Sequence, residues 1–377
     1  MGSDIESVDN DMIDITAFSL KIDSAIRSES GSNFGASRVQ SFTSVVDNAI
    51  RSRTVSIYGT SPVSSFASAE DNATRAIPAR FFSLAELEAA TNNFSLDSKI
   101  GAGSFSIVYR GKIFDGREVA VKTSEMWLKR EGKWALLSGL YHKNLIGLVG
   151  FCEENNQRLL VYEYMKNGSL YDRLHDKVGI STVLNSWRIR IKIALDASRG
   201  IEYLHNHEDS SIIHGDIKSS NILLDATWTA RVSDFGWKFM RNRHIGQEYN
   251  IVLSAESDVY GFGVVLLELL TGKTPTFVCR ENGGTLLSVK HLVDFAVTAI
   301  FYGSFMDVLD DRVGPPNVNE AEALKLVAHT AIPCVNLKLK DRPTMADIVA
   351  RLEQALAICD SSPYDRISGG NIYDVSE

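Results

Sequence analysis

The sequence lacks the features that mark secreted, membrane-spanning and nucleic-acid-binding chains. Its four cysteines are widely spaced and form no CxxC pair, which argues against a disulfide framework or zinc site and favours a reducing compartment. Residues 1–10 are acidic and have no apolar core, so no secretory signal is expected. The most apolar stretch, residues 259–270, is shorter than the roughly 18 residues that span a bilayer, and it contains Glu268, which predicts a buried helix. The formal net charge of -8 leaves no basic excess, so we expect no nucleic-acid partner.

What is present divides the chain into four parts. Its N-terminal part is rich in Ser, Asn, Asp and Arg without a sustained hydrophobic period, and such a segment buries too little apolar surface to fold. Leu84, Leu87 and Ala90 have helical spacing. The predicted parts are a disordered Ser-rich segment (1–78), a helical lead-in (80–94), one large folded domain (95–359) and a flexible tail (360–377).

The folded domain begins with strand patterns and continues with helical ones. Short β-branched runs predict strands over residues 106–110, 118–121 and 158–164, with a turn at residues 114–117. The predicted helices cover residues 187–204, 257–270, 287–302, 320–335 and 345–357. A small β-rich half followed by a larger helical half predicts two lobes with a cleft between them.

A glycine-rich turn, IGAGSFSIV at residues 100–108, lies between two strand-like runs. Gly101 and Gly103 let backbone N–H groups come close to phosphate oxygens. A dinucleotide-binding interpretation is disfavoured, because it needs a helix directly after the glycines. The next strand ends in EVAVK, where Lys122 suits contact with the α- and β-phosphates. Alone, the turn is also typical of an ordinary loop, and the lysine of an ordinary strand edge.

Two downstream motifs carry polar residues at fixed spacing between apolar runs. They are IIHGDIKSSNILLD (residues 212–225) and RVSDFG (residues 231–236). Phosphoryl transfer needs a carboxylate that accepts a hydroxyl proton, which suits Asp216. It also needs oxygen ligands for Mg²⁺, which suits Asn221 and Asp234. Lys218 would neutralise the migrating phosphoryl group and is typical of serine/threonine specificity. The order and spacing of all four motifs exclude a purely structural interpretation.

On these motifs the sequence resembles the plant receptor-like protein kinases, with the Crinkly-related branch nearest. The likeness covers about residues 80–359 and includes FFSLAELEAATNNF, LLVYEYMKNGSL and SDVYGFGVVLLELLTGK. The resemblance implies an α+β fold, the bilobal protein-kinase fold, with a small β-rich N-lobe (95–165) and a larger helical C-lobe (166–359). It also implies a serine/threonine kinase that uses ATP and Mg²⁺.

The resemblance further implies which residues form the site. Asp216 and Lys218 would be catalytic, and Asn221 and Asp234 would bind the metal. The expected nucleotide-binding residues come from both lobes and are Ile100, Gly101, Gly103, Val108, Ala120, Lys122, Glu163, Met165 and Leu223.

Two structural ties and a setting in the cell are also implied. Asp258 is expected to brace the catalytic loop, and Glu248 to pair with Arg342, a kind of buried pair that costs about 3–5 kcal/mol to break on one side. We expect protein substrates and a membrane receptor kinase as partner, with no transmembrane segment in this chain. The expected location is the cytoplasm, at the inner face of the plasma membrane, with the N-terminal segment as tether or as a leader without specific role.

The segment after the second motif departs from the family pattern. Only 13 residues lie between Asp234 and Glu248, fewer than the family usually has, and residues 234–253 contain no Ser or Thr. Gln247 stands where the family has proline. Gly215 replaces the arginine that normally pairs with a phosphorylated activation loop. A protein substrate would therefore lack its usual docking surface, and one form of control is removed.

The N-lobe departs from the pattern at two positions. Lys133 occupies the helix position that should supply a glutamate to Lys122, and it would repel Lys122 instead of orienting it. Glu131 can take that role if the helix unwinds. Ser106 replaces the third glycine of the turn, which is a minor change.

These departures leave three interpretations. An active serine/threonine kinase is favoured, because its expected residues are all present and lineages freed from catalysis commonly lose the aspartate and asparagine first. These residues are Lys122, Asp216, Lys218, Asn221 and Asp234. The alternative is a catalytically impaired pseudokinase that acts as a nucleotide-binding scaffold. A third is that coding sequence was skipped in the gene model, which sequencing of the transcript would decide.

Lys133→Glu tests whether this lysine limits activity. We expect the substitution to raise phosphorylation of substrate by radiolabelled ATP, because a glutamate would attract Lys122. No gain would mean that Glu131 or another group already orients Lys122.

Overall fold

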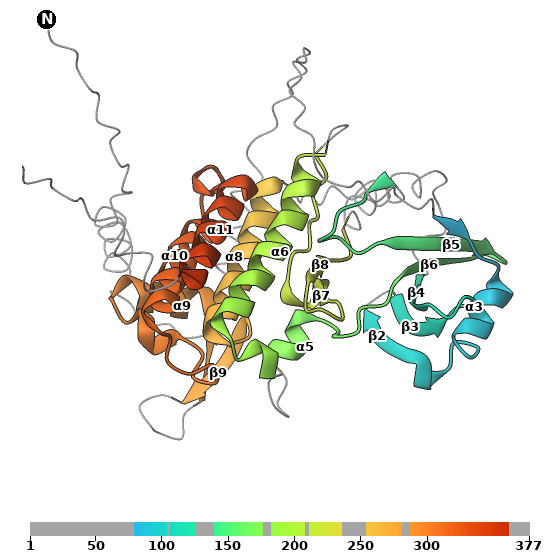
Figure 1. Cartoon of the computed structure of the whole chain (residues 1–377), viewed down its shortest axis with the longest axis horizontal. Coiled ribbons are helices and arrows are strands. Elements are labelled where there is room, and N and C mark those ends of the chain that lie inside the picture. The colour runs from blue at the N-terminus through green and yellow to red at the C-terminus, as the bar shows by residue number, and fades with distance from the viewer. Residues whose placement is uncertain are drawn as a thin grey trace, which may run out of the picture. The chain divides into compact units, whose positions relative to one another are not determined.

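The computed structural model describes residues 79–103, 106–124, 139–175, 182–207, 211–235, 254–280 and 287–361 (Figure 1). All of them belong to one of the two compact units of the chain, the unit made of residues 65–248 and 253–377. The expectations for residues 1–78 and for most of the tail lie outside the described residues. Among the helices of the described part, none is both long and apolar enough to cross a membrane.

The N-lobe is built on a six-stranded sheet. Its strands are β1 (Arg80–Phe81), β2 (Lys99–Gly103), β3 (Ser106–Lys112), β4 (Glu118–Ser124), β5 (Leu148–Glu154) and β6 (Gln157–Glu163). They lie in the order β1-β5-β6-β4-β3-β2, and neighbours are antiparallel except that β1 is parallel to β5. The predicted strands correspond to β3, β4 and β6, although β3 and β4 continue further than the β-branched runs. The strands β1, β2 and β5 lie outside the predicted set.

One face of the sheet carries the core of this lobe. Val119 and Val121 of β4 are fully buried and belong to one hydrophobic cluster with Leu84 and Leu87. Both leucines lie on helix α3 (Leu84–Ala90), so the helix predicted from their spacing is confirmed. Because alternate side chains of a strand point to opposite faces, Ala120, which lies between the two valines, and Lys122, which follows them, point away from this core.

The lead-in joins the edge of the sheet because residue 150 is a glycine. Strand β1 pairs with Gly150 and Phe151 of β5. A Cβ atom on Gly150 would lie 2.1 Å from the carbonyl oxygen of Arg80 and 2.6 Å from the ring of Phe82. No other residue type leaves room for this approach, which also brings Phe82 into the N-lobe core.

The C-lobe is mainly helical and is arranged around α8. Its helices are α5 (Leu170–His175), α6 (Trp187–His205), α8 (Ala255–Thr271), α9 (Leu292–Phe301), α10 (Val318–Cys334) and α11 (Met345–Asp360). Helix α8 is largely buried; α6, α9 and α10 pack against it, and α11 packs on α6 and α10 (Figure 1). The described C-lobe also contains two antiparallel strand pairs, β7 (Ile222–Leu224) with β8 (Ala230–Val232) and β9 (Thr276–Arg280) with β10 (Leu287–His291). The β-rich lobe followed by a helical lobe agrees with the prediction.

The helix predicted over residues 287–302 is wrong for its first five residues. They form β10, in which Val289 lies opposite Val278 of β9, and α9 begins only at Leu292. The alternation in LSVKH is a strand pattern, but it runs directly into the helical spacing that follows. The other predicted helices exist, with ends that differ by a few residues.

A buried ion pair ties α6 to the segment after α9. Arg190 is 2% exposed, and its guanidinium donates to Asp310 Oδ2 at 2.6 Å. It also donates to the carbonyl oxygens of Leu184 and Leu269, at 2.8 and 2.7 Å. Burial alone would raise the pKa of Asp310, but hydrogen bonds and charge from Arg312 and Arg190 hold that pKa below its ordinary value. The carboxylate is therefore charged although it is buried.

Asp310→Ala should lower the free energy of unfolding by about 3–5 kcal/mol, because Arg190 would remain buried without its carboxylate. Urea unfolding of the full chain measures this change. The neighbouring Asp311 is exposed, and Asp311→Ala should change stability by about 0.5 kcal/mol or less. Equal effects of the two substitutions would contradict the assigned role of the pair.

Candidate active site

The loop of residues 214–221, called the motif loop below, is held in a turn by its own side chains. Its end, Ser219–Asn221, forms the short 3₁₀ helix η4. Asn221 Nδ2 donates to the carbonyl oxygen of Asp216 at 2.8 Å and to Asp216 Oδ2 at 3.2 Å. Lys218 Nζ lies 2.7 Å from the same Oδ2. Three residues predicted from the sequence are thus brought together around one carboxylate.

Helix α8 fixes the start of the motif loop through Asp258, which is 1% exposed. Its Oδ2 accepts the N–H of His214 at 2.8 Å, and its Oδ1 accepts the N–H of Gly215 at 2.7 Å. His205 Nε2 lies 2.9 Å from Oδ2. Gly215 has a φ of +79°, which glycine adopts without strain. The expected contact of Asp258 with the loop is confirmed.

His214 is completely buried, and its two ring nitrogens have different partners. Nε2 donates to the carbonyl oxygen of Ser233 at 2.8 Å, and Nδ1 accepts the N–H of Asp216 at 3.2 Å. Only a neutral imidazole has one donor and one acceptor nitrogen, so these bonds select the neutral ring. Burial lowers the pKa of His214, which agrees with this assignment.

Lys122 and Asp234 link the two lobes directly. Lys122 Nζ lies 2.6 Å from Asp234 Oδ1. Asp234 follows β8 and has a φ of +63°, a left-handed conformation that residues other than glycine seldom adopt. The backbone of Asp234 is therefore held in an uncommon conformation, and its carboxylate contacts Lys122. This contact joins the EVAVK and RVSDFG motifs.

Lys122 stands in a row of residues that crosses the sheet. Gly101 of β2 lies opposite Val108 of β3, and Val108 lies opposite Lys122 of β4. Directly opposed residues share a face, and Ala120, two positions before Lys122, points to that face too. Gly101, Val108, Ala120 and Lys122, which are predicted nucleotide-binding residues from three strands, therefore share the face opposite the N-lobe core.

The glycines of β2 are not required by the packing of their described neighbours. A Cβ atom on Gly101 would come no closer than 3.8 Å to Val108, and one on Gly103 no closer than 3.4 Å to Ser106 Oγ. Both glycines thus leave space above the strand, as a backbone that approaches phosphate groups needs. Ile100, on the same strand, is 47% exposed.

Three of the residues predicted near the adenine, Glu163, Met165 and Leu223, lie where the N-lobe sheet leads into the C-lobe. Glu163 ends β6, and Met165 follows it and is buried in the C-lobe cluster. Leu223 of β7 lies opposite Arg231 of β8, and Arg231 Nη1 donates to Glu163 Oε2 at 3.0 Å. This bond ties the side chain of Glu163 to the hairpin that carries Leu223.

The polar atoms at this site suit a hard divalent cation. Asn221 uses Nδ2 for Asp216, which leaves its carbonyl Oδ1 as the ligand atom, and Asp234 supplies carboxylate oxygens. Oxygen ligands of this kind are those that Mg²⁺ prefers. Within the described ranges, no group of three or more His, Cys, Asp or Glu could hold a metal by itself. Phosphate oxygens and water would therefore complete the coordination.

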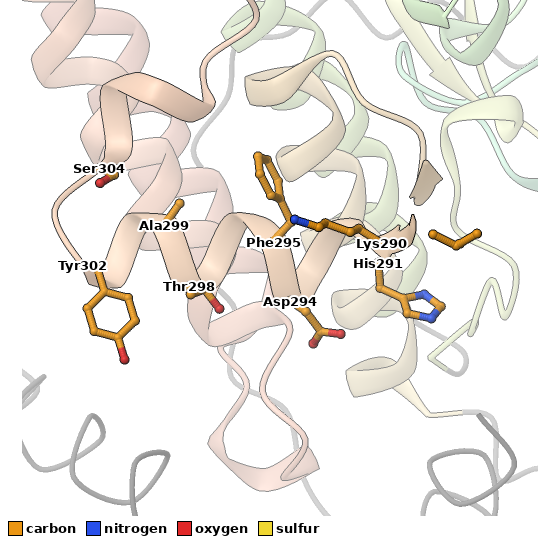
Figure 2. Close-up of a pocket in the computed structure, with 9 residues that line it drawn as sticks. Lys290, His291, Asp294, Phe295, Thr298, Ala299, Tyr302 and Ser304 are labelled. Atoms are coloured by element: carbon orange, nitrogen blue, oxygen red, sulfur yellow. The ribbon is translucent and has the colours of Figure 1, made fainter. Parts of the chain in front are cut away.

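A cavity of about 590 Å³ lies elsewhere, along α9 and the end of β10. Figure 2 shows Lys290 and His291 at one end of this cavity, and Tyr302 and Ser304 at the other. None of the residues predicted to bind nucleotide or metal lines it. We therefore assign it no part in nucleotide binding.

Two buried residues, one in the motif loop and one on α8, were not predicted from the sequence. Ser219 is 2% exposed, and its Oγ donates to Glu268 Oε2 of α8 at 2.8 Å. The sequence does give a signal for Glu268, because an acidic residue inside an apolar helix needs a polar partner when it is buried. The partner cannot be identified from the sequence, because Ser219 lies 49 residues from Glu268 in the chain.

A family model of the protein kinase domain matches residues 94–352. The chain belongs to the protein kinase family. Members of this family generally use ATP and a divalent metal ion. The predicted protein-kinase fold is confirmed.

Two proteins of Arabidopsis thaliana are similar to this chain. It is 49% identical over 338 residues to the "Putative serine/threonine-protein kinase-like protein CCR3", covering 79% of this chain and 41% of that protein. It is 41% identical over 329 residues to the "Serine/threonine-protein kinase-like protein CCR4", covering 78% of this chain and 43% of that protein. The chain spans less than half the length of either relative. These similarities confirm the predicted resemblance to Crinkly-related plant kinases.

A solved structure with the same fold is the pseudokinase domain of BIR2, described as an immune regulator of the RLK/Pelle family. The TM-score is 0.60 at 28% sequence identity, and the match covers 78% of this kinase chain and 92% of that one. The fold is thus shared by relatives named as kinases and by a domain named as a pseudokinase.

Several residues that bear on activity lie outside the described residues. They are Glu131, Lys133, Gln247 and Glu248. The expected pair of Glu248 with Arg342 therefore stays a prediction. Arg342 itself donates to the carbonyl oxygens of Asn336 and Glu256, at 2.7 Å each.

Asp258→Ala should lower the free energy of unfolding by about 3 kcal/mol, because the buried N–H of His214 and the partly buried N–H of Gly215 would lose their acceptor at about 1–3 kcal/mol each. Asp307 is exposed, so Asp307→Ala serves as the control in the same urea titration. If the two variants unfolded at the same urea concentration, Asp258 would not brace the motif loop.

Proposed function

We propose that this kinase domain transfers the γ-phosphoryl group of ATP to serine and threonine residues of proteins in plant receptor-type signalling. One observation carries the proposal: Lys122 Nζ lies 2.6 Å from Asp234, while Asn221 and Lys218 both contact the carboxylate of Asp216. Three motifs of the sequence thereby supply one set of phosphate, metal and proton-handling groups.

Asn221 Oδ1 and the carboxylate of Asp234 would hold Mg²⁺. When bound, the ion would neutralise charge on the β- and γ-phosphates. Both residues are held before any ligand arrives, Asn221 by Asp216 and Asp234 by Lys122. This preorganisation supports the proposed metal site, because ligands fixed by neighbouring bonds need little rearrangement.

The nucleotide would bind to the face of the sheet that carries Lys122. Gly101 and Gly103, with Ile100 beside them, would let the backbone of β2 cover the phosphates, and Lys122 would contact the α- and β-phosphates. The adenine would lie among the apolar side chains of Val108, Ala120, Leu223 and Met165, next to the hinge at Glu163. The described neighbours of Gly101 and Gly103 leave room for a larger side chain, so packing does not explain these glycines. This supports their assignment to phosphate binding.

Asp216 would orient the substrate hydroxyl and accept its proton. Lys218 Nζ lies 2.7 Å from that carboxylate and is half-exposed, so it can contact an incoming group without leaving Asp216. It would stabilise the negative charge of the phosphoryl group as it moves to the hydroxyl oxygen. The lysine at this position, with the serine/threonine class of the relatives, supports serine and threonine as acceptors.

The resemblance to receptor-like kinases supports a setting for this reaction. We propose protein substrates and a membrane receptor kinase as partner, in the cytoplasm at the inner face of the plasma membrane. Mg²⁺ is proposed as the divalent ion because the ligands are a carboxylate and an amide oxygen.

A second candidate is a nucleotide-binding pseudokinase that acts as a scaffold. The likeness to the pseudokinase domain of BIR2 favours it, as do Lys133 and the short segment between Asp234 and Glu248. This candidate shares the nucleotide site with the first and differs only in turnover.

An assay with radiolabelled ATP on the full chain separates the two candidates. For an active kinase, Asp216→Ala should reduce autophosphorylation by about 100-fold or more, because general-base catalysis contributes about 10²–10⁴-fold. Asp97 is exposed in the other lobe, and Asp97→Ala should leave the rate unchanged.

A thermal shift with Mg-ATP completes the comparison. Stabilisation of the wild type by Mg-ATP, together with phosphorylation no faster than in Asp216→Ala, would favour the pseudokinase. Absence of any shift would contradict both candidates.

A further inference from the structure

Glu268 is a carboxylate at the centre of an apolar helix. It is 1% exposed on α8, where its neighbours Leu266, Leu267, Leu269 and Leu270 are buried as well. Withdrawing a carboxylate from water is strongly unfavourable unless hydrogen bonds replace the lost solvation. The proposed reaction, as described above, assigns this residue no part.

The partners of Glu268 come from two other parts of the C-lobe. Its Oε2 accepts from Ser219 Oγ at 2.8 Å and lies 2.8 Å from His175 Nε2. Ser219 belongs to the motif loop, and His175 is the last residue of α5. The side chains of His175 and Ser219 are themselves buried, so all three groups meet away from water.

The hydrogen bond from Ser219 to Glu268 lies next to two predicted site residues of the motif loop. Ser219 lies directly after Lys218 and two positions before Asn221, in the single turn of η4. The N–H of Asn221 donates to the carbonyl oxygen of Lys218 at 3.0 Å, so the turn sets the positions of both residues. No side chain caps η4 at its start. The contact with Glu268 is therefore a side-chain anchor that ties this turn to the protein core.

We infer that Glu268 is a positioning residue: through Ser219 it holds the turn that presents Asn221 to the metal and Lys218 to the phosphoryl group. The inference rests on the proposed function. Asp258 fixes the start of the motif loop and Glu268 fixes its end, both from α8. His175 supplies the second hydrogen bond that makes the buried carboxylate tolerable.

Two adjacent serines provide a matched test. Ser219 is buried and bonded to Glu268, whereas Ser220 is exposed. ATP binding to the full chain would be measured by calorimetry at increasing Mg²⁺, beside the rate of phosphorylation. Ser219→Ala should weaken Mg²⁺-dependent ATP binding and lower kcat by about tenfold each, the size seen when the support of a metal ligand is removed. Ser220→Ala should match the wild type.

A conservative change at the carboxylate adds a second arm. Glu268→Gln retains an oxygen that accepts from Ser219, so it should preserve ATP binding better than Ser219→Ala does. A purely structural role of the Ser219 contact would lower thermal stability without changing Mg²⁺-dependent affinity, and that result would overturn the inference. Equal weakening by Ser219→Ala and Ser220→Ala would overturn it too.

The binding readout separates this inference from the proposed function. A wild-type chain that binds Mg-ATP but transfers no phosphate would contradict the proposed kinase activity, while the serine comparison would still decide the role of Glu268. A chain that phosphorylates substrate but shows wild-type affinity and kcat in Ser219→Ala would contradict only the inference.

Discussion

Two buried carboxylates on one helix hold the loop on which the rest of the site depends. Asp258 and Glu268 are both 1% exposed on α8, and they accept hydrogen bonds from opposite ends of the motif loop. Ten residues of helix separate them by about 15 Å. Because α8 is enclosed by other helices, the loop takes its rigidity from the C-lobe core. Burying a carboxylate is unfavourable, so two buried carboxylates that bind one loop are consistent with a need to fix the geometry of that loop.

The second constraint is the contact between lobes. Lys122 comes from the N-lobe sheet and Asp234 from the segment after β8, and their 2.6 Å contact joins the sheet face that carries Lys122 to the C-lobe. The uncommon backbone conformation of Asp234 indicates that the surrounding structure sets this position. The intact set of Lys122, Asp216, Asn221 and Asp234 is compatible with catalysis. The departures from the family pattern at Lys133 and after Phe235 do not remove any of these four residues. They bear on how efficient catalysis would be.

The motifs made the fold class and the central residues predictable, because phosphoryl transfer restricts which side chains can stand at each spacing. The ends of the strands were less predictable. Strand β10 was also not predicted, because its sequence leads directly into a helix and only its pairing with β9 decides its conformation. The partner of Glu268 could not be predicted at all. A lone acid in an apolar helix indicates a buried polar contact, but only the fold shows that Ser219 and His175 provide it.

Native-state hydrogen exchange tests most directly whether α8 anchors the motif loop. The account predicts that the amide protons of His214, Gly215 and Asn221 exchange as slowly as those in the middle of α8, because the loop opens only when the C-lobe core opens. Exchange of these three amides as fast as that of the exposed turn at residues 115–117 would contradict it.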